Sequence, residues 1–437
     1  MQEAANVVDV VGAALPVTME EKDNEHELLH RAIARDPELF AAQQRVREIA
    51  DAAQDGIVDT RALEVHPNPS WQDGDAASDA VVLMVGSQQG DIPMRITEQT
   101  HRQFAEKTDI GWKYYNRMLM TQPGLLCENV RTWFNEEPKE RMIRSLAPLT
   151  EDDRALAERF STPYTARAFL GAGYQPLDNA ALLSKVLPIV GQHPDAEVAD
   201  WDIGPDSFHM RITVVEHDVH AVARGYAAAH PEQPAHACNL AEPISFGFAL
   251  RNSETGRGSM TVAPMMKVLR CINLATGEVA YRAVHYGGRQ KGEAAIEYQT
   301  DTRRLDDAAK IMKVRDHVIQ LLNPAEIERM ALTAARAELV EIPEEIKLFD
   351  FVGSLGAGFD LTEREQEVLR DETVREVSVT GRRTAFTVSQ ALTATARELG
   401  GEVGADRKAE IERFGFRVLE NPVEKLVAIA EKGGYEA

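Results

Sequence analysis

Cysteine is scarce in this sequence, which has 3 among 437 residues. Cys127, Cys238 and Cys271 are odd in number and lie far apart, so they do not match the paired cysteines of disulfide-rich secreted proteins. Reduced thiols in a reducing compartment fit this spacing better. The chain does not need cross-links, because its length allows two or three domains that each bury a core of their own.

Long apolar runs are also missing, and none approaches the roughly 18 residues that are needed to cross a bilayer. Segment 1–21 lacks the basic stretch that opens a signal peptide. We therefore expect a cytoplasmic protein with no membrane partner.

The usual catalytic signatures are absent from the sequence. It has no G-x-S-x-G, no H-E-x-x-H and no dinucleotide-binding glycine pattern, and GSLGAGFD at 353–360 lacks the residues that complete a phosphate loop. The cluster His217, His220, His230, His236 and Cys238 matches no metal-binding spacing. We expect no metal and no cofactor, and an enzyme with an unrecognised site is the third of three interpretations of function.

Acidic residues outnumber basic residues in this sequence. It has 70 Asp and Glu and 48 Lys and Arg, which gives a net charge of -22. Such a charge argues against indiscriminate binding of polyanions. Residues 251–315 are an exception, with 12 basic and 7 acidic side chains, whereas residues 331–437 have 14 and 21. Since salt screens exposed charges beyond about 8–10 Å, a local positive surface can still attract an anion. The alternative is a solvated face without a ligand.

Hydrophobic periodicity predicts the fold class. Four segments alternate apolar and polar residues between turns that contain glycine or asparagine, as antiparallel strands do, at 207–217, 244–253, 259–275 and 278–286. Helical spacing returns near residue 300 and persists almost to the end. The sequence thus predicts an α+β fold, with helices packed on a central antiparallel sheet (about residues 200–290) and a helical C-terminal half.

The rest of the chain is expected to be mostly helical. Segment 37–54 predicts one helix, 97–136 a pair of helices capped by Thr97, and 150–190 a helix, a turn and a helix, while 80–86 predicts a short buried strand.

A polar, turn-forming linker at 66–79 suggests where the chain divides. The expected regions are an N-terminal extension (1–79), an α+β core domain (80–330) and a helical C-terminal region (331–437). On this division, a chain that starts near Ala80 is expected to stay folded.

The stretch RNSETGRGSMTVAPMMKVLRCINLATG, at 251–277, predicts a tight turn between two strands. Asn and Gly tolerate positive φ, and an ion pair between Glu254 and Arg257 would stabilise such a turn. The structural turn residues are Asn252, Glu254, Gly256 and Gly258. The segment after Pro264 fits either a returning strand or the start of a helix.

Basic side chains in and after this turn form the candidate binding set. They are Arg251, Arg257, Lys267, Arg270, Arg282, His285 and Arg289. His285 lies between two arginines in a glycine-rich segment, which favours contact with phosphate over proton transfer. The alternative is that these arginines only pair with the many carboxylates of the chain.

The chain resembles the phage/plasmid-like proteins grouped as domain of unknown function 932 in three motifs that occur in the same order. The motifs are the segment 96–134, GYQPLDN at 173–179 and LRNSETGRGSMTVAPMMKVLRCIN at 250–273. Their pattern is N-S-E-x-G, an apolar strand and R-x-x-C-x-N, after an earlier R-Y-x-x-L-D-N. The resemblance covers roughly residues 80–400. The chain departs from the pattern at Leu274 and Ala275, where the family has glycine, and at Gly173, where it has arginine.

This resemblance implies an accessory role in replication, recombination or host take-over by a mobile element, in the host cytoplasm. The favoured interpretation is binding of nucleic acid, in particular single-stranded DNA binding or annealing, because a β-ribbon beside a basic helix can follow a phosphate backbone. The alternative is a non-catalytic oligomeric or partner-binding protein that uses the acidic helical C-terminal region, with a homo-oligomer as one form of it. A continuous positive groove would favour the first, and an exposed apolar patch the second.

Overall fold

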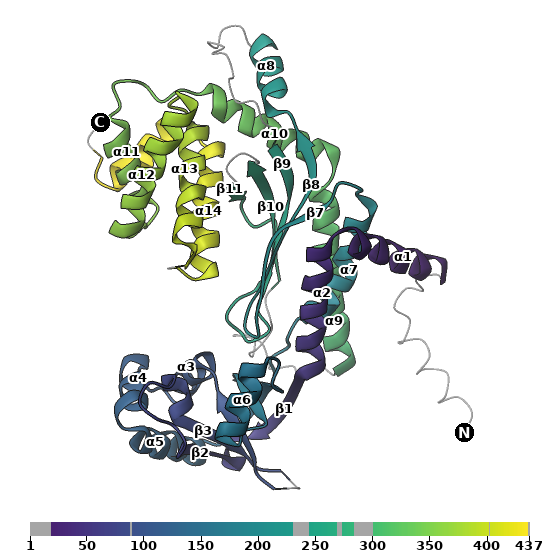
Figure 1. The fold of residues 1–437 in the computed structure, drawn as a ribbon, viewed down its shortest axis with the longest axis vertical. Helices are drawn as coiled ribbons and strands as arrows, with labels where there is room; N and C mark the ends of the chain where they lie inside the picture. Colours follow the sequence, from purple (N-terminus) through teal and green to yellow (C-terminus); the bar gives the residue numbers. More distant parts are fainter. Residues whose placement is uncertain are drawn as a thin grey trace.

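The computed structural model describes residues 19–87, 90–229, 244–268, 273–283, 300–401 and 403–435. These residues form an α+β fold with two six-stranded sheets and many helices, which confirms the predicted fold class (Figure 1). Three residues of the candidate binding set, Arg270, His285 and Arg289, lie outside the described residues.

The first sheet is built from the N-terminal part of the chain, in the order β1-β5-β6-β4-β3-β2. Its strands pair antiparallel except for β4 and β6, which are parallel. The strands are β1 (Ala53–Asp59), β2 (Leu63–Pro67), β3 (Val81–Val85), β4 (Ile92–Ile96), β5 (Glu140–Leu146) and β6 (Tyr164–Gly171). The helices of this part are α3 (Glu98–Lys107), α4 (Trp112–Thr121), α5 (Pro123–Glu136) and α6 (Glu151–Phe160). Buried Phe104, Tyr115 and Val130 join α3, α4 and α5 to the core of this sheet.

The second sheet is antiparallel, in the order β11-β10-β9-β8-β7, and β12 also pairs with β10. Its strands are β7 (Glu197–Ile203), β8 (Phe208–His217), β9 (Ile244–Asn252), β10 (Met260–Val268), β11 (Asn273–Thr276) and β12 (Tyr281–Ala283). This is the sheet that the alternating segments predict. Pro264 lies inside β10, so the strand continues where a helix was the open alternative.

One face of the second sheet packs on helices. Phe248 and Val262 share a core with Leu183, Val186 and Val314, because the apolar residues of β9 and β10 alternate toward this face. The helices that contribute to this core are α1 (Met19–Arg35), α2 (Pro37–Ala52), α7 (Asn179–Gln192) and α9 (Thr300–Leu321).

The C-terminal half is helical, as predicted, and packs on the other end of the second sheet. Leu392 and Phe416 share a core with Phe246 and Met266 of the sheet. The helices of this part are α8 (Val219–Ala229), α10 (Pro324–Leu339), α11 (Leu348–Gly358), α12 (Glu363–Thr380), α13 (Ala385–Glu398), α14 (Ala405–Glu420) and α15 (Val423–Lys432).

The N-terminal part differs from the sequence expectation in several elements. The segment 97–136 forms three helices instead of two, although Thr97 caps the first as expected. The strand β6 occupies the place of the expected turn between α6 and α7, because its apolar residues, such as Phe169, fill the interior of the first sheet.

The predicted boundary at residues 79 and 80 falls inside the first sheet. The strand β2 pairs with β3 across it, and β1 pairs with β5. Residues Leu39, Val46 and Ile49 of α2 are buried in the core of the second sheet. Removal of residues 1–79 would therefore expose strand edges in one sheet and apolar residues in the other.

A β-bulge shapes the middle of the second sheet. The register of β8 on β9 shifts between Thr213 and Val215, which brings the backbone of Ile212 against Gly247. A Cβ at position 247 would overlap the carbonyl group of Ile212, so only glycine fits there.

None of the helices in the described part of the chain has the combination of length and apolar character that a membrane-spanning helix needs.

Candidate functional site

The turn at 252–258 connects β9 to β10 at the end of the second sheet that faces the first sheet (Figure 1). Among its described residues only Gly256 has a positive φ, of +81°. The turn is not exposed at its start, because Asn252, Ser253, Glu254 and Thr255 are all buried. Side chains of the first sheet and of α3 cover them.

Glu254 is the centre of a buried ion cluster between the two sheets. Its Oε2 lies 3.0 Å from the Arg167 guanidinium, and its Oε1 accepts the backbone N–H of Asn179 at 2.8 Å. Arg144 donates to the carbonyl oxygen of Glu254 at 2.8 Å and pairs with Asp55 at 2.9 Å. Arg144 and Arg167 are 3% and 1% exposed, so their charges depend on these partners. We call Arg144, Arg167, Glu254 and Asp55 the junction cluster.

Two of the motifs found in the sequence meet at this place. The Asn252 side-chain amide donates to the Leu177 carbonyl at 2.6 Å and to Asn179 Oδ1 at 2.8 Å. Gln103 of α3 donates to the Thr255 carbonyl at 2.8 Å. The segment 173–179 and the turn are therefore held together by hydrogen bonds, and Gln103 connects the turn to α3.

A cavity of about 180 Å³ lies next to this turn, between the second sheet and α14. Sixteen of the described residues line it, and none of these is acidic or has an aromatic ring other than the imidazole of His209. Five of them are arginines, Arg211, Arg251, Arg257, Arg282 and Arg413. We call this cavity the arginine pocket.

Strand register explains why two distant arginines share one wall of this pocket. Thr261 of β10 is directly opposite Arg251 of β9 on one side and Arg282 of β12 on the other. His209 of β8 is opposite Arg251 in turn. Residues directly opposite each other in antiparallel strands point to the same face of the sheet, so these four side chains form one row.

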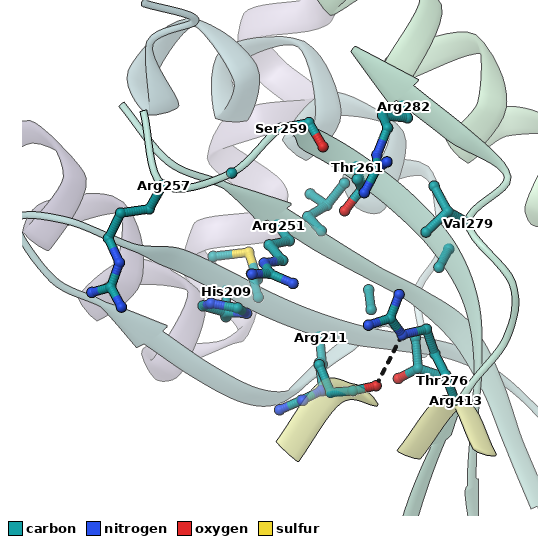
Figure 2. Close-up of a pocket in the computed structure, with 16 residues that line it drawn as sticks. His209, Arg211, Arg251, Arg257, Ser259, Thr261, Thr276, Val279, Arg282 and Arg413 are labelled. Carbon is teal, nitrogen blue, oxygen red and sulfur yellow. Dashed lines mark hydrogen bonds between the residues drawn. The ribbon is translucent and has the colours of Figure 1, made fainter. Parts of the chain in front are cut away.

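The helix α14 supplies the opposite wall. Its buried Glu412 accepts from Arg211 at 2.8 Å and from the Thr276 hydroxyl at 3.2 Å, which fixes the helix on the sheet. Arg413, the residue after Glu412, lines the pocket. Its Nε donates to the carbonyl oxygen of Ala409 at 3.2 Å. Figure 2 shows the guanidinium groups of Arg251, Arg282 and Arg413 pointing toward a common space, with Arg257 at one end.

The arginines of the pocket differ in how their charge is balanced. Arg211 pairs with Asp200 at 2.6 Å as well as with Glu412. Within the described ranges, Arg257, Arg282 and Arg413 form no ion pair. Burial lowers the pKa of Arg413, and the positive charges of Arg251 and Arg417 lower it further, against the opposite effect of nearby carboxylates. The pocket therefore holds positive charge that an anion would stabilise.

The carboxyl group of Asp206, which is outside the pocket lining, interacts with one pocket arginine and one arginine of the junction cluster. Burial raises the pKa of Asp206, while the positive charges of Arg257 and Arg167 act in the opposite direction. Asp206 is not among the described residues that line the pocket, but its carboxyl group interacts with the charge of Arg257 from outside the lining.

The structure brings together only part of the predicted binding set. Arg251, Arg257 and Arg282 line the pocket, and so does Gly258 of the turn. Lys267 lies farther along β10 and does not line the pocket, and its ammonium group is 3.5 Å from the carboxylate of Glu197 in β7. Glu254 pairs with Arg167 rather than with Arg257, its neighbour in the turn.

Several lining residues were missed by sequence reasoning. They are His209, Arg211, Ser259, Thr261, Thr276 and Arg413. The spacing of His209 and Arg211 by two residues on a predicted strand is a signal that they share a face, but only the register of β8 on β9 shows which face. No local signal marks Arg413, which lies on a helix far along the chain.

No group of three His, Cys, Asp or Glu side chains in the described residues is arranged to hold a metal ion. His230, His236 and Cys238 lie outside the described residues, as does Cys271.

Comparison of the chain with protein-family models, curated proteins and solved structures finds no significant match.

Proposed function

We propose that this protein binds nucleic acid through its phosphate groups, with single-stranded DNA as the ligand, in an accessory role for a mobile element. The observation that supports the proposal is the arginine pocket, whose described lining residues include five arginines and no acidic residue. Guanidinium groups bind phosphate oxygens through paired, charge-assisted hydrogen bonds. The resemblance of the turn and of the segment 173–179 to phage and plasmid proteins agrees with this ligand.

The lining of the pocket also suggests the mode of binding. Among the described lining residues there is no Phe, Tyr or Trp on which a base could stack. Binding through phosphates without stacking depends strongly on salt and little on base sequence. We therefore expect similar affinities for single strands of different sequence and a steep loss of affinity as salt increases.

Fluorescence anisotropy of the full chain with a labelled single strand, at roughly 50 and 200 mM salt, tests the proposal. The salt slope should be about 0.7 per phosphate neutralised, and Arg257→Ala and Arg282→Ala should each reduce it by somewhat less than one. Lys267→Ala removes the same charge outside the pocket and serves as the control. If the folded protein binds no strand at the lower salt, the proposal is wrong.

A second candidate function is binding of a partner protein by the acidic C-terminal region. Phe349 of α11 and Val374 and Val379 of α12 are apolar side chains of this region that are 54%, 54% and 51% exposed. Sedimentation of the full chain and of a Phe349→Ser, Val374→Ser double variant tests it. A self-association that the double variant loses would favour this candidate.

A further inference from the structure

The arginine pocket has space for a phosphate group. A cavity of about 180 Å³ is well above the roughly 10–15 Å³ that one water molecule requires. The charge and the donors of the lining indicate which kind of phosphate group suits it.

The charge of the pocket exceeds what one backbone phosphate needs. A phosphodiester has a single negative charge, whereas a phosphomonoester has about -1.5 to -2 at pH 7. Arg257, Arg282 and Arg413 are without ion pairs inside the described part of the chain, and Arg251 lies in the same row as Arg282. Several guanidinium groups around a small space stabilise a dianion more than a monoanion.

Neutral donors complete the lining. The hydroxyl groups of Ser259 and Thr261 are on the same wall as the arginines, next to Arg282 (Figure 2). A phosphomonoester has three terminal oxygens that accept hydrogen bonds, so it can use these hydroxyl groups as well as the guanidinium groups.

We propose that the arginine pocket binds a phosphomonoester, the terminal phosphate at the end of a single DNA strand. This inference rests on the proposed function and names the part of the strand that the pocket takes. Ala249 and Ala263 lie opposite each other in β9 and β10, beside the row of Arg251 and Thr261, and their small side chains leave the space open. A larger residue at position 249 would fill that space without a change of charge.

The test compares strands of one sequence that differ only at their ends. Internally labelled single strands with a 5′-phosphate, a 3′-phosphate or hydroxyl groups at both ends are titrated with the full chain at roughly 50 mM salt. A phosphate at one of the ends should tighten binding by roughly tenfold, the effect of one further charge-assisted hydrogen bond. Treatment of that strand with a phosphatase should remove the gain.

Variants show whether the pocket causes the preference. Arg282→Ala and Ala249→Leu should each remove the preference for the phosphorylated end, whereas Lys267→Ala should keep it. Circular dichroism and urea unfolding show which variants are folded, and Arg282→Ala provides the test if Ala249→Leu disturbs the sheet. If the preference survives in folded Arg282→Ala and Ala249→Leu proteins, the assignment to the pocket is overturned.

The remaining outcomes separate this inference from the proposed function. Equal affinity for all three strands overturns the inference and leaves the proposed function in place. Failure of every strand to bind overturns both. If inorganic phosphate or a nucleoside monophosphate competes at the concentration at which the phosphorylated strand binds, the pocket takes a free phosphate compound and the assignment to a strand end is wrong.

Discussion

Two groups of arginines lie on either side of one short turn and differ in their partners. In the junction cluster, Arg144 and Arg167 are buried and each contacts carboxylate or carbonyl oxygens of the chain itself. In the arginine pocket, Arg257, Arg282 and Arg413 have no ion pair among the described residues. The comparison teaches that clustering of arginines does not indicate a binding site by itself. The balance of nearby carboxylates decides whether the arginines hold the fold together or are available to an anion.

The turn connects the two groups. Hydrogen bonds hold Asn252 and Thr255 in place. Arg251 directly precedes Asn252 and Arg257 directly follows Gly256, so two arginines of the pocket flank this fixed part of the turn. The junction cluster therefore positions part of the pocket, and substitutions in the two groups should have different consequences.

The largest effect is expected in the junction cluster. Glu254→Gln leaves Arg167 buried without a counter-charge, which should lower the free energy of unfolding by about 3–5 kcal/mol. Urea unfolding measures it. The control is Glu278→Gln, which breaks an exposed pair with Arg417 (2.6 Å) and should cost less than about 1 kcal/mol. Equal costs for the two variants would show that the junction cluster has no special role in stability.

A second test uses a buried histidine that stays neutral in the folded protein. His101 is fully buried, its Nε2 donates to the Ser78 carbonyl at 3.0 Å, and the Tyr115 hydroxyl donates to its Nδ1 at 2.8 Å. Burial lowers the pKa of His101 to about 4. The unfolded chain has a pKa near 6.5, so this contribution to stability is complete above pH 6.5 and is lost as the pH falls toward 4.

That loss should amount to about 3 kcal/mol, from the difference between the two pKa values. Urea unfolding of the natural chain and of His101→Gln at pH 7 and pH 4 isolates it, because the other titrating groups are common to both. The natural chain should lose more stability than the variant over this range. A parallel pH dependence of the two proteins would contradict the assignment.

Single arginines of the pocket should matter little for stability. Arg257→Ala and Arg282→Ala should each change the free energy of unfolding by less than about 0.5 kcal/mol, because both side chains are exposed and have no ion pair in the described part of the structure. The same variants should weaken the binding of single strands. Arg167→Ala is the opposite case, since it should destabilise the fold strongly. A large stability loss in Arg282→Ala would show that this residue belongs with the structural arginines.

The smallest effect is expected for Arg413→Gln. Burial of Arg413 and its repulsion by Arg251 and Arg417 act against its charge, Glu410 and Glu278 act in its favour, and glutamine keeps much of the packing of the side-chain stem. Because these effects oppose each other, stability should change by no more than a few tenths of a kcal/mol. Thermal unfolding in low salt measures this change, and a clear fall in melting temperature would indicate that Arg413 has a structural partner.

Local sequence signals were sufficient for much of the architecture. The alternating segments between 207 and 286 predict the second sheet, and the helical spacing after residue 300 predicts the C-terminal helices, because these periods follow from local backbone geometry. The first sheet was mostly missed. Its strands are short, three helices separate β4 from β5, and β6 pairs in parallel with β4, which lies far away along the chain.

The sequence by itself determined the turn and its glycine, since the residues at 252–258 have the conformational preferences that a tight connection between strands requires. It also determined that Arg251 and Arg257 lie near each other. The tertiary structure alone decided that Glu254 neutralises Arg167, that Arg282 joins the row of Arg251 and Thr261, and that Arg413 completes the pocket. The physical reason is that strand register and helix docking are set by contacts between distant segments, and those contacts determine which charges are paired.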